Sequence, residues 1–285
     1  MLILKNSHHD DHTDDHDFIH PYDLARAVKP AAPSRRDMLK KLGAAAGSLA
    51  ILGACSKSAL SFSPTQSSTD ATTSTDNSNG QCVEIPSETK GPYPLDGSSG
   101  STNALSNIYR TNIIGSDISS TSGVPLTVNL SIQDVSAGCS PVLGAAVYIW
   151  HCDQYGQYSG YSSSQNGSNS GKTFCRGIVV TDANGLASFT TLYPGWYAGR
   201  ITHIHMAVYL NNNLSSTPKV SQLGFPQSIT QAVYGVAPYS AKGQNTSVTS
   251  FAADNIFSDG TTYQIASVSG NTSSGYVANL KVGIP

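Results

Sequence analysis

The chain has 285 residues, of which 12% are charged, and its formal net charge at pH 7 is −2. This balance gives no basic field that could attract a nucleic-acid backbone, so no nucleic-acid binding is expected. Gly, Ser, Thr and Asn are abundant. That mixture favours short strands joined by polar turns over amphipathic helices.

Residues 1–54 have the order of an export signal. The twin arginines Arg35 and Arg36 precede a Gly/Ala-rich apolar run over residues 42–54. This run is shorter than the ~20 residues that a membrane-spanning helix needs. A charged region, a short apolar region and a small-residue end are typical of a signal peptide, and the twin arginine indicates the bacterial route for folded proteins. We expect an exported, periplasmic or cell-surface protein.

The run ends in Leu52-Gly53-Ala54-Cys55, which resembles a bacterial lipoprotein box. We expect a lipid on Cys55 that holds the protein at a membrane surface without spanning it. The alternative is ordinary signal cleavage, which gives Cys55 no role. Residues 55–81 are rich in Ser, Thr and Asn and have few apolar side chains, so they are predicted to form a flexible tether.

The remaining cysteines form an even set of four: Cys82, Cys139, Cys152 and Cys175. In an oxidising compartment, such a set favours two disulfides, and spacing alone leaves three connectivities open. No two of them form a CxxC pair, which argues against a zinc or redox centre.

Residues 82–285 show short stretches in which apolar and polar side chains alternate, the period of β-strands. The clearest are residues 126–132, 147–150 and 276–282. Residues 178–191 carry Asn184-Gly185 between two apolar runs, which is typical of a β-hairpin. No stretch combines a helical period with caps. We predict a single all-β domain with long loops, a β-sandwich in preference to a barrel.

One predicted strand, residues 203–210, places two histidines on the same face. His203 and His205 would lie roughly 7 Å apart at Cα, close enough to converge on one ion. Five of the eight histidines precede Arg35, so the pair stands out in the part expected to be mature. The opposite face would pack into the core through Ile204, Met206, Val208 and Leu210.

Tyrosine is the candidate metal ligand closest in sequence to the two histidines. No Asp, Glu or Cys lies between Tyr193 and Leu210 to complete a zinc or iron(II) site, whereas Tyr197 is close by. A phenol has a pKa near ~10 and must lose its proton to bind a metal, which a hard trivalent cation can achieve. Two phenolates and one hydroxide would balance the charge of iron(III), and two neutral imidazoles would complete its coordination.

The motifs around the pair resemble those of the intradiol ring-cleaving dioxygenases, which include the protocatechuate and catechol dioxygenases. The resemblance spans roughly residues 82–225. Its motifs are Trp150 eight residues before Tyr158, Arg176-Gly177, Thr181-Asp182, Pro194-Gly195-x-Tyr197, Arg200, and His203-Ile204-His205. The interval from Tyr197 to His203 is shorter than in the protocatechuate enzymes and is similar to that of a secreted subgroup.

The resemblance implies an iron(III) enzyme that inserts dioxygen between the two hydroxylated carbons of a catechol and gives a cis,cis-muconate-type diacid. The implied iron ligands are Tyr158, Tyr197, His203 and His205. Tyr158 has Tyr155 and Tyr161 as its alternatives. By the same resemblance, Tyr197 leaves the iron and serves as base.

The resemblance also implies roles for three further residues. Arg200 stabilises negative charge on the ring and contacts the substrate, and Gln222 orients the oxygen that is inserted. Tyr93 lines the substrate pocket. The non-catalytic alternatives are a surface salt bridge for Arg200 and an ordinary strand position for Gln222. His151 is expected to be structural or exposed.

Two other classes of function stay open at this point. One is a non-catalytic, surface-anchored β-sandwich that binds sugar or protein, for which the tether is equally suitable. The other is a different metalloenzyme, such as a copper oxidase, built on the same His-x-His strand. The visible colour and the metal content of the purified protein separate these classes from an iron(III) enzyme.

Overall fold

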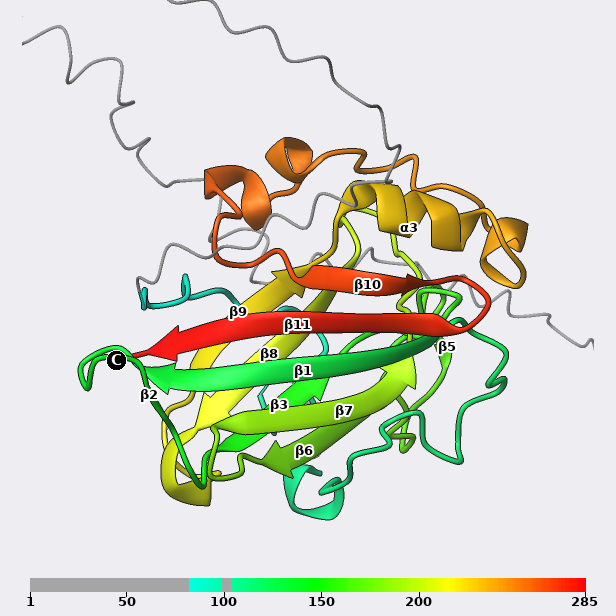
Figure 1. Ribbon diagram of the computed structural model, residues 1–285. Helices are drawn as coiled ribbons and strands as arrows, with labels where there is room; N and C mark the ends of the chain where they lie inside the picture. Colours follow the sequence, from blue (N-terminus) through cyan, green and yellow to red (C-terminus); the bar gives the residue numbers. More distant parts are fainter. Residues whose placement is uncertain (1–81, 99–103) are drawn as a thin grey trace, which may run out of the picture. The chain divides into compact units, whose positions relative to one another are not determined.

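The computed structural model describes residues 82–98 and 104–285 (Figure 1). The predicted signal region, Cys55 and the predicted tether lie outside the described residues. None of the helices in the described part of the chain is long and apolar enough to cross a membrane.

The first sheet is built around β1 (Pro125–Asp134), which pairs in parallel with β11 (Gly275–Ile284) and antiparallel with β7 (Leu186–Leu192). Two shorter strands extend it. They are β10 (Ser267–Asn271) beside β11, and β2 (Ser140–Pro141) beside β1. The sequence periodicity over residues 126–132 and 276–282 agrees with β1 and β11, in which alternate side chains are buried.

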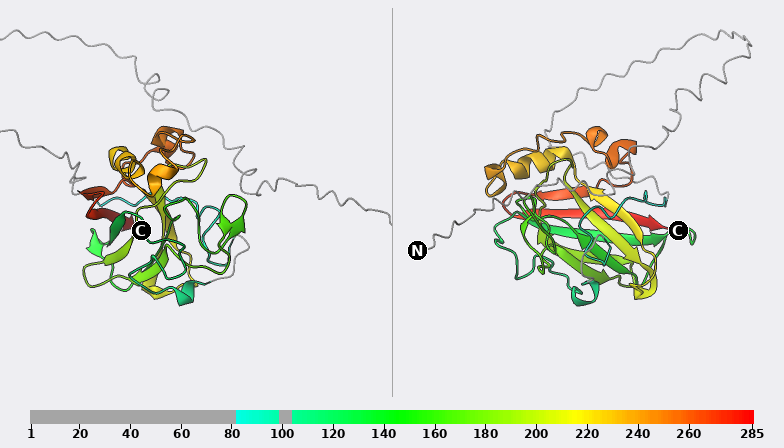
Figure 2. Two further views of the ribbon diagram at one scale, coloured as in Figure 1. Left: turned by 90° about the vertical axis from the view of Figure 1, so that its right-hand side faces the viewer. Right: turned by 180° about the vertical axis from the view of Figure 1, so that it is seen from behind.

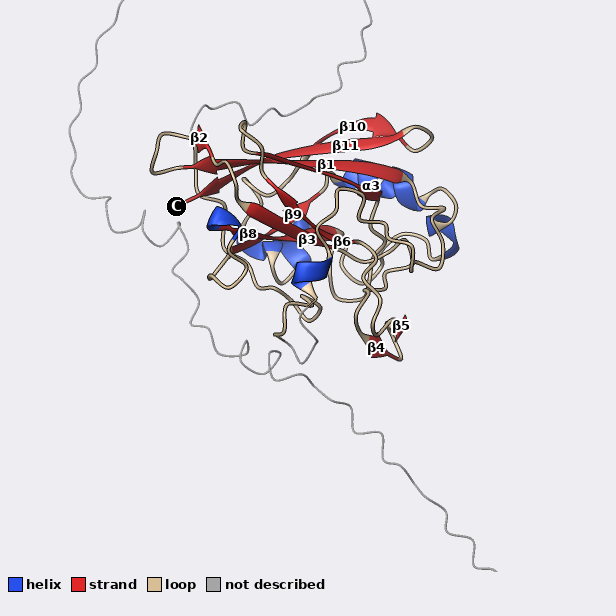
Figure 3. Cartoon of the chain, turned by 90° about the horizontal axis from the view of Figure 1, so that it is seen from below, coloured by secondary structure: helices blue, strands red, loops and turns tan. Residues whose placement is uncertain are grey.

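The second sheet is antiparallel and has the order β6-β3-β8-β9. Its strands are β6 (Arg176–Val180), β3 (Ala146–Trp150), β8 (His203–Tyr209) and β9 (Lys219–Gly224). A separate small hairpin projects from this side of the molecule (Figure 3) and pairs β4 (Ser162–Ser163) with β5 (Gly167–Ser168).

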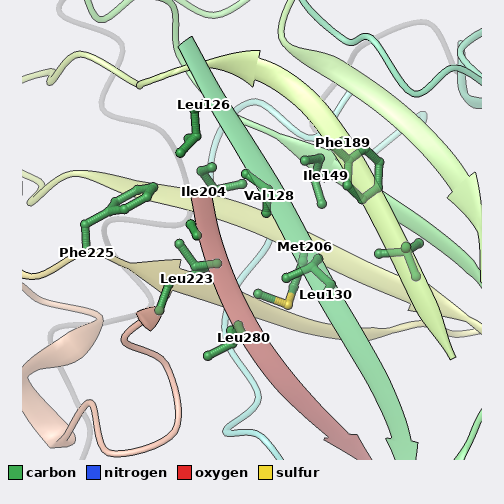
Figure 4. Close-up of a cluster of buried hydrophobic side chains, with 14 of the residues drawn as sticks. Leu126, Val128, Leu130, Ile149, Phe189, Ile204, Met206, Leu223, Phe225 and Leu280 are labelled. Carbon is green, nitrogen blue, oxygen red and sulfur yellow. The ribbon is translucent and has the colours of Figure 1, made fainter. Parts of the chain in front are cut away.

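The two sheets pack face to face around one apolar core, so the predicted β-sandwich is confirmed. Figure 4 shows side chains of β1, such as Val128 and Leu130, against Ile204 and Met206 of β8 and Leu223 of β9. Because alternate residues of a strand point to opposite faces, the odd-numbered residues of β8 point away from this core. His203 and His205 are therefore placed on the outer face of the second sheet.

The predicted hairpin over residues 178–191 is wrong. β6 belongs to the second sheet and β7 to the first, so the turn at Asp182–Gly185 links the two sheets. Gly185 has φ +70°, and a β-carbon there would lie 2.5 Å from the Ile132 carbonyl oxygen. The Asn-Gly pair thus predicts a tight turn correctly, but the pairing of each strand is decided by partners elsewhere in the chain.

Leu210 also departs from the sequence prediction. The strand ends at Tyr209, and Leu210 begins the 3₁₀ turn η2 (Leu210–Asn212), where it is 45% exposed. The core face of β8 therefore consists of Ile204, Met206 and Val208.

A helical segment after β9 covers one side of both sheets, as the views in Figures 1 and 2 agree. Its elements are α3 (Gln227–Tyr234), η3 (Tyr239–Ala241), η4 (Phe251–Ala253) and η5 (Phe257–Asp259), and one further 3₁₀ turn, η1 (Leu105–Asn107), precedes β1. Sequence analysis does not predict α3, because this helix has only eight residues and Pro226 provides no side-chain cap.

The four cysteines expected to form two disulfides are all free thiols, so that prediction is wrong. Cys152 and Cys175 are buried, and burial raises the pKa of both thiols, which keeps them protonated. The Cys152 thiol donates to the Gly195 carbonyl at 3.4 Å. Buried cysteines of this kind behave as small apolar residues, and the thiolate needed for disulfide exchange is not formed.

Candidate metal centre

A row of four side chains in register crosses one end of the second sheet. Trp150 on β3 pairs with Arg176 on β6 and with His205 on β8, and His205 pairs in turn with Gln222 on β9. All four residues are buried, under the loops that cover the outer face of this sheet. Strand register thus brings residues from four separate parts of the sequence to one place.

The four predicted iron ligands gather beside this row. Ring centroids lie 4.7 Å apart for His203 and His205, 5.8 Å for Tyr197 and His203, and 5.6 Å for Tyr158 and Tyr197. Tyr158 lies 6.3 Å from His205. No group of three His, Cys, Asp or Glu side chains suited to a metal occurs among the described residues, so a metal centre here depends on the tyrosines.

The two imidazoles present their Nε2 atoms to each other at 3.0 Å. His203 Nδ1 donates to the Ile201 carbonyl at 2.6 Å, which leaves the lone pair on Nε2. Burial lowers the pKa of both rings, that of His203 to about 3, so both are neutral. Two metal–nitrogen bonds of about 2.05 Å at a right angle span about 2.9 Å, so this separation suits two ligands of one ion.

Two polar atoms of the cluster are buried without a hydrogen-bond partner, the Tyr158 hydroxyl and His205 Nδ1. Buried polar groups in folded proteins are nearly always satisfied, so an orphan hydroxyl indicates a partner such as a bound ion. Burial also raises the pKa of Tyr158 and Tyr197, so both phenols keep their protons unless a strongly charged cation replaces them. Two such phenols and two neutral imidazoles fit a hard trivalent ion such as iron(III).

His205 is held in place by aromatic stacking. Its ring lies against Trp150 with the centroids 4.9 Å apart and the planes 5° apart, and Trp150 stacks in turn on Tyr148 at 4.6 Å. On the other side, a β-carbon added at Gly91 would lie 2.9 Å from His205 Cε1. The imidazole is therefore enclosed between the indole and the backbone of the loop at Gly91.

Tyr158 is fixed by its own loop. Its backbone amide donates to Asn166 Oδ1 at 2.6 Å, and the Asn166 amide donates back to the Tyr158 carbonyl at 2.7 Å. The two alternative tyrosines are engaged differently. Tyr155 is 39% exposed, and the Tyr161 hydroxyl accepts from the Leu95 amide at 2.8 Å. Of the three, Tyr158 is the one that contacts His205 and Tyr197.

Tyr93, the predicted substrate-pocket residue, is half-buried at the edge of the cluster. Its ring stacks on Tyr158 at 4.8 Å and meets Tyr161 edge-on at 5.2 Å. It also lies 6.5 Å from Tyr197. Tyr93 thus forms part of an aromatic wall beside the candidate ligands.

Arg200 and Gln222 lie together next to His203. Arg200 Nη2 donates to Gln222 Oε1 at 2.7 Å, and Nη1 lies 3.5 Å from His203 Nε2. Arg200 Nε lies 2.9 Å from a carboxylate oxygen of Asp254, which sequence analysis does not identify. Asp254 lies in the helical segment, 54 residues after Arg200, and none of the sequence motifs described above includes it.

Two other aromatic residues near the motifs are structural. Tyr193 belongs to the core between the sheets, and its hydroxyl pairs with Thr230. His151 is buried, with its ring nitrogens bonded to the Cys152 carbonyl and the Thr191 hydroxyl, both at 2.7 Å. Burial lowers the pKa of His151 to about 4, so it is a neutral packing residue, in agreement with one of its two expected roles.

Comparison with known proteins shows similarity to dioxygenases. The model of the family described as Dioxygenase matches residues 97–226. An intradiol ring-cleavage dioxygenase from Tetranychus urticae is 28% identical, with a TM-score of 0.59, over 71% of this chain and 95% of that chain. A second solved structure, the dioxygenase Tetur07g02040, is also 28% identical, with a TM-score of 0.56, over 71% and 94%. A search of curated proteins returns no match.

The matched region contains Tyr158, Tyr197, Arg200, both histidines of β8 and Gln222, whereas Asp254 lies beyond it. Both solved structures share the fold over almost their whole length. The chain is therefore similar in sequence and fold to intradiol ring-cleavage dioxygenases, and this similarity supports an intradiol ring-cleaving enzyme.

Proposed function

We propose that the protein is a non-haem iron(III) dioxygenase that cleaves a catechol-type ring between its two hydroxylated carbons and uses O2 as co-substrate. The observation that carries the proposal is the convergence of two tyrosines and two histidines, with the histidine Nε2 atoms 3.0 Å apart. The candidate ligands are Tyr158, Tyr197, His203 and His205. When bound, iron(III) would act as a Lewis acid that draws electron density from the catechol oxygens.

The two tyrosines are proposed to have different tasks because they differ in exposure. Tyr158 is buried and packed beneath Tyr93, so it is suited to a permanent ligand. Tyr197 is half-buried, so its oxygen would be the one able to accept a proton from an entering catechol. Burial raises the pKa of Tyr197, while the nearby charge of Arg200 works in the opposite direction.

Arg200 supplies the fixed positive charge beside the reacting ring. Its positively charged guanidinium reaches to within 3.5 Å of His203 Nε2. A charge held there stabilises negative charge that develops on the ring during attack by oxygen. Gln222 shares a hydrogen bond with Arg200, and we assign it the task of orienting the oxygen that is inserted.

The substrate is proposed to lie against the aromatic wall that includes Tyr93. An aromatic ring packs well against the faces and edges of other rings, which favours a flat phenolic substrate over an aliphatic one. The hydroxyl groups of the catechol would then face the candidate ligands.

Metal reconstitution tests this function. Protein stripped of metal and supplied with iron(III) should take up one ion per chain, become red-brown from phenolate-to-iron charge transfer, and consume O2 with catechol. A colourless, iron-free protein would support a binding protein instead. Uptake of copper in preference to iron, without O2 consumption on catechol, would support the alternative metalloenzyme.

We also propose that the enzyme works outside the cytoplasm. The support is the sequence alone: Arg35-Arg36, the apolar run that follows, and Cys55 in a lipoprotein-type box. A lipid on Cys55 and the polar stretch of residues 56–81 would place the enzyme at a membrane surface with freedom to reach substrates around it.

A further inference from the structure

The charge of Arg200 is compensated by one carboxylate among the described residues. Asp254 is fully buried, and one of its oxygens lies 2.9 Å from Arg200 Nε. Arg200 itself is almost buried. A buried guanidinium without a counter-charge is unstable, because its desolvation is repaid only by a close anionic partner. The position of the Arg200 charge therefore depends on the position of Asp254.

Asp254 is held rigidly by backbone amides. Its carboxylate accepts hydrogen bonds from the amides of Ile201 and Ile256, both at 2.8 Å, and of Phe257 at 3.2 Å. Burial works against the charged carboxylate, but the Arg200 charge and these hydrogen bonds hold the pKa of Asp254 below its ordinary value. Asp254 is therefore a fixed negative charge, placed between η4 and η5 of the helical segment.

The other end of the guanidinium is held by Gln222. Arg200 Nη2 donates to Gln222 Oε1 at 2.7 Å, and the Gln222 amide donates to the Thr89 carbonyl at 3.1 Å. With Nε on Asp254 and Nη2 on Gln222, the planar group has one orientation, and in it Nη1 faces His203. A planar fork fixed at two points cannot turn without breaking both contacts.

We propose that Asp254 is a positioning residue that aims Arg200 at the candidate active site. This inference rests on the proposed function and deepens it, because it makes the helical segment part of the catalytic apparatus. The family match ends at residue 226, and Asp254 lies outside it. The segment drawn in orange above the sheets in Figure 1 thus does more than cover the sandwich, since it supplies the counter-ion.

Replacement of Asp254 should reduce turnover without removing the metal. Asp254→Asn removes the charge and turns one acceptor oxygen into a donor, so the guanidinium loses its anchor. A displacement of about 1 Å in a catalytic group can cost about 100-fold in rate. We expect kcat with catechol to fall about 100-fold, while KM changes less than about 3-fold and iron content stays the same.

A double-mutant cycle separates positioning from general stabilisation. If Asp254 acts through Arg200, then Asp254→Asn should change kcat less than about 2-fold in an Arg200→Met background. Asp254→Glu keeps the charge and should restore much of the turnover lost in Asp254→Asn. Asp134→Asn is the matched control, since Asp134 accepts from the amides of Ser136 and Ala137 in a turn and contacts no arginine in the described part of the chain; it should behave as wild type.

A measurement on metal-free protein supplies a readout other than activity. The Nε–H of Arg200 should give a slowly exchanging ¹⁵N NMR signal, identified by its loss in Arg200→Met, and Asp254→Asn should make its exchange at least about 10-fold faster. Equal loss of kcat in both backgrounds, or unchanged kcat and exchange in folded Asp254→Asn, would overturn the positioning role. If Asp254→Asn does not fold, the test passes to Asp254→Glu. Wild-type kcat in folded Asp254→Glu, together with fast exchange of the Arg200 Nε–H, would then overturn the positioning role. Failure of wild-type protein to cleave any catechol would instead overturn the proposed function.

Discussion

Gly91 lies so close to His205 that a β-carbon at position 91 would stand 2.9 Å from the imidazole Cε1. Gly91 also has φ +66°, a conformation that glycine adopts readily and other residues do not. The absence of a side chain at Gly91 therefore lets the loop that carries Tyr93 pack closely against His205, a candidate iron ligand. This contact explains why the segment Gly91-Pro92-Tyr93 belongs to the site even though it precedes the first strand.

Gly91→Ala should weaken metal binding. The added methyl group must displace His205 or lift the loop, and we expect iron affinity to fall about 10-fold or more. Gly171→Ala is the matched control, because Gly171 has φ +77° but no atom within 4 Å of the place that an added methyl group would take. Both variants carry the backbone strain, so only the difference in iron affinity between them reports the His205 contact. Equal affinities would contradict this role of Gly91.

Tyr158→Phe should abolish the red-brown colour and the activity together, with the fold unchanged. The phenyl ring can keep its stacking on Tyr93, but the hydroxyl that is buried without a partner is removed. Tyr161→Phe is the control, since it loses the hydrogen bond from Leu95 and leaves the four candidate ligands in place. Visible spectra and iron analysis of both variants check this; iron and full activity in Tyr158→Phe would remove Tyr158 from the ligand set.

The Asp254–Arg200 pair predicts a pH-dependent contribution to stability. The pKa of Asp254 is lowered in the folded protein, so its stabilising effect is complete above the unfolded pKa of about 3.9 and is lost as pH falls through the lower, folded value. The difference in unfolding free energy between wild type and Asp254→Asn, measured in urea on metal-free protein, should be constant above about pH 5 and shrink below about pH 4. The buried neutral histidines affect both proteins alike. A difference that grows on acidification would contradict the charged state of Asp254.

Export and anchoring can be tested in a bacterial host. Arg35→Lys combined with Arg36→Lys should leave the protein in the cytoplasm, because the twin arginine is the recognised part of the signal. Cys55→Ser should move mature protein from the membrane fraction to the soluble fraction. An unmodified N-terminus downstream of Cys55, found by mass spectrometry of wild-type protein, would contradict the lipid anchor.

Local patterns in the sequence account for much of the sandwich. Alternation of side chains predicts β1, β3, β8 and β11, since each buries one face against the opposite sheet. It does not predict which strands pair. The turn at Asn184-Gly185 is correct, yet the strands on either side belong to different sheets, because pairing depends on contacts remote in sequence.

The candidate site divides in the same way. The resemblance of short motifs to those of the intradiol dioxygenases selects Tyr158, Tyr197, His203 and His205, which the fold then brings together. No sequence motif identifies Asp254, because its contact with Arg200 depends on how the helical segment folds back onto the sheets. The disulfide prediction failed for a related reason, since an even number of cysteines says nothing about whether each thiol is buried away from a partner.

Cleavage of catechol in an atmosphere of ¹⁸O2 tests the central claim most directly. Iron-loaded protein should convert catechol to a cis,cis-muconate-type diacid in which both inserted oxygen atoms carry the label, as mass spectrometry would show. Intact catechol after prolonged incubation, a product opened beside the two hydroxyl groups, or a product with one labelled oxygen would each contradict an intradiol dioxygenase.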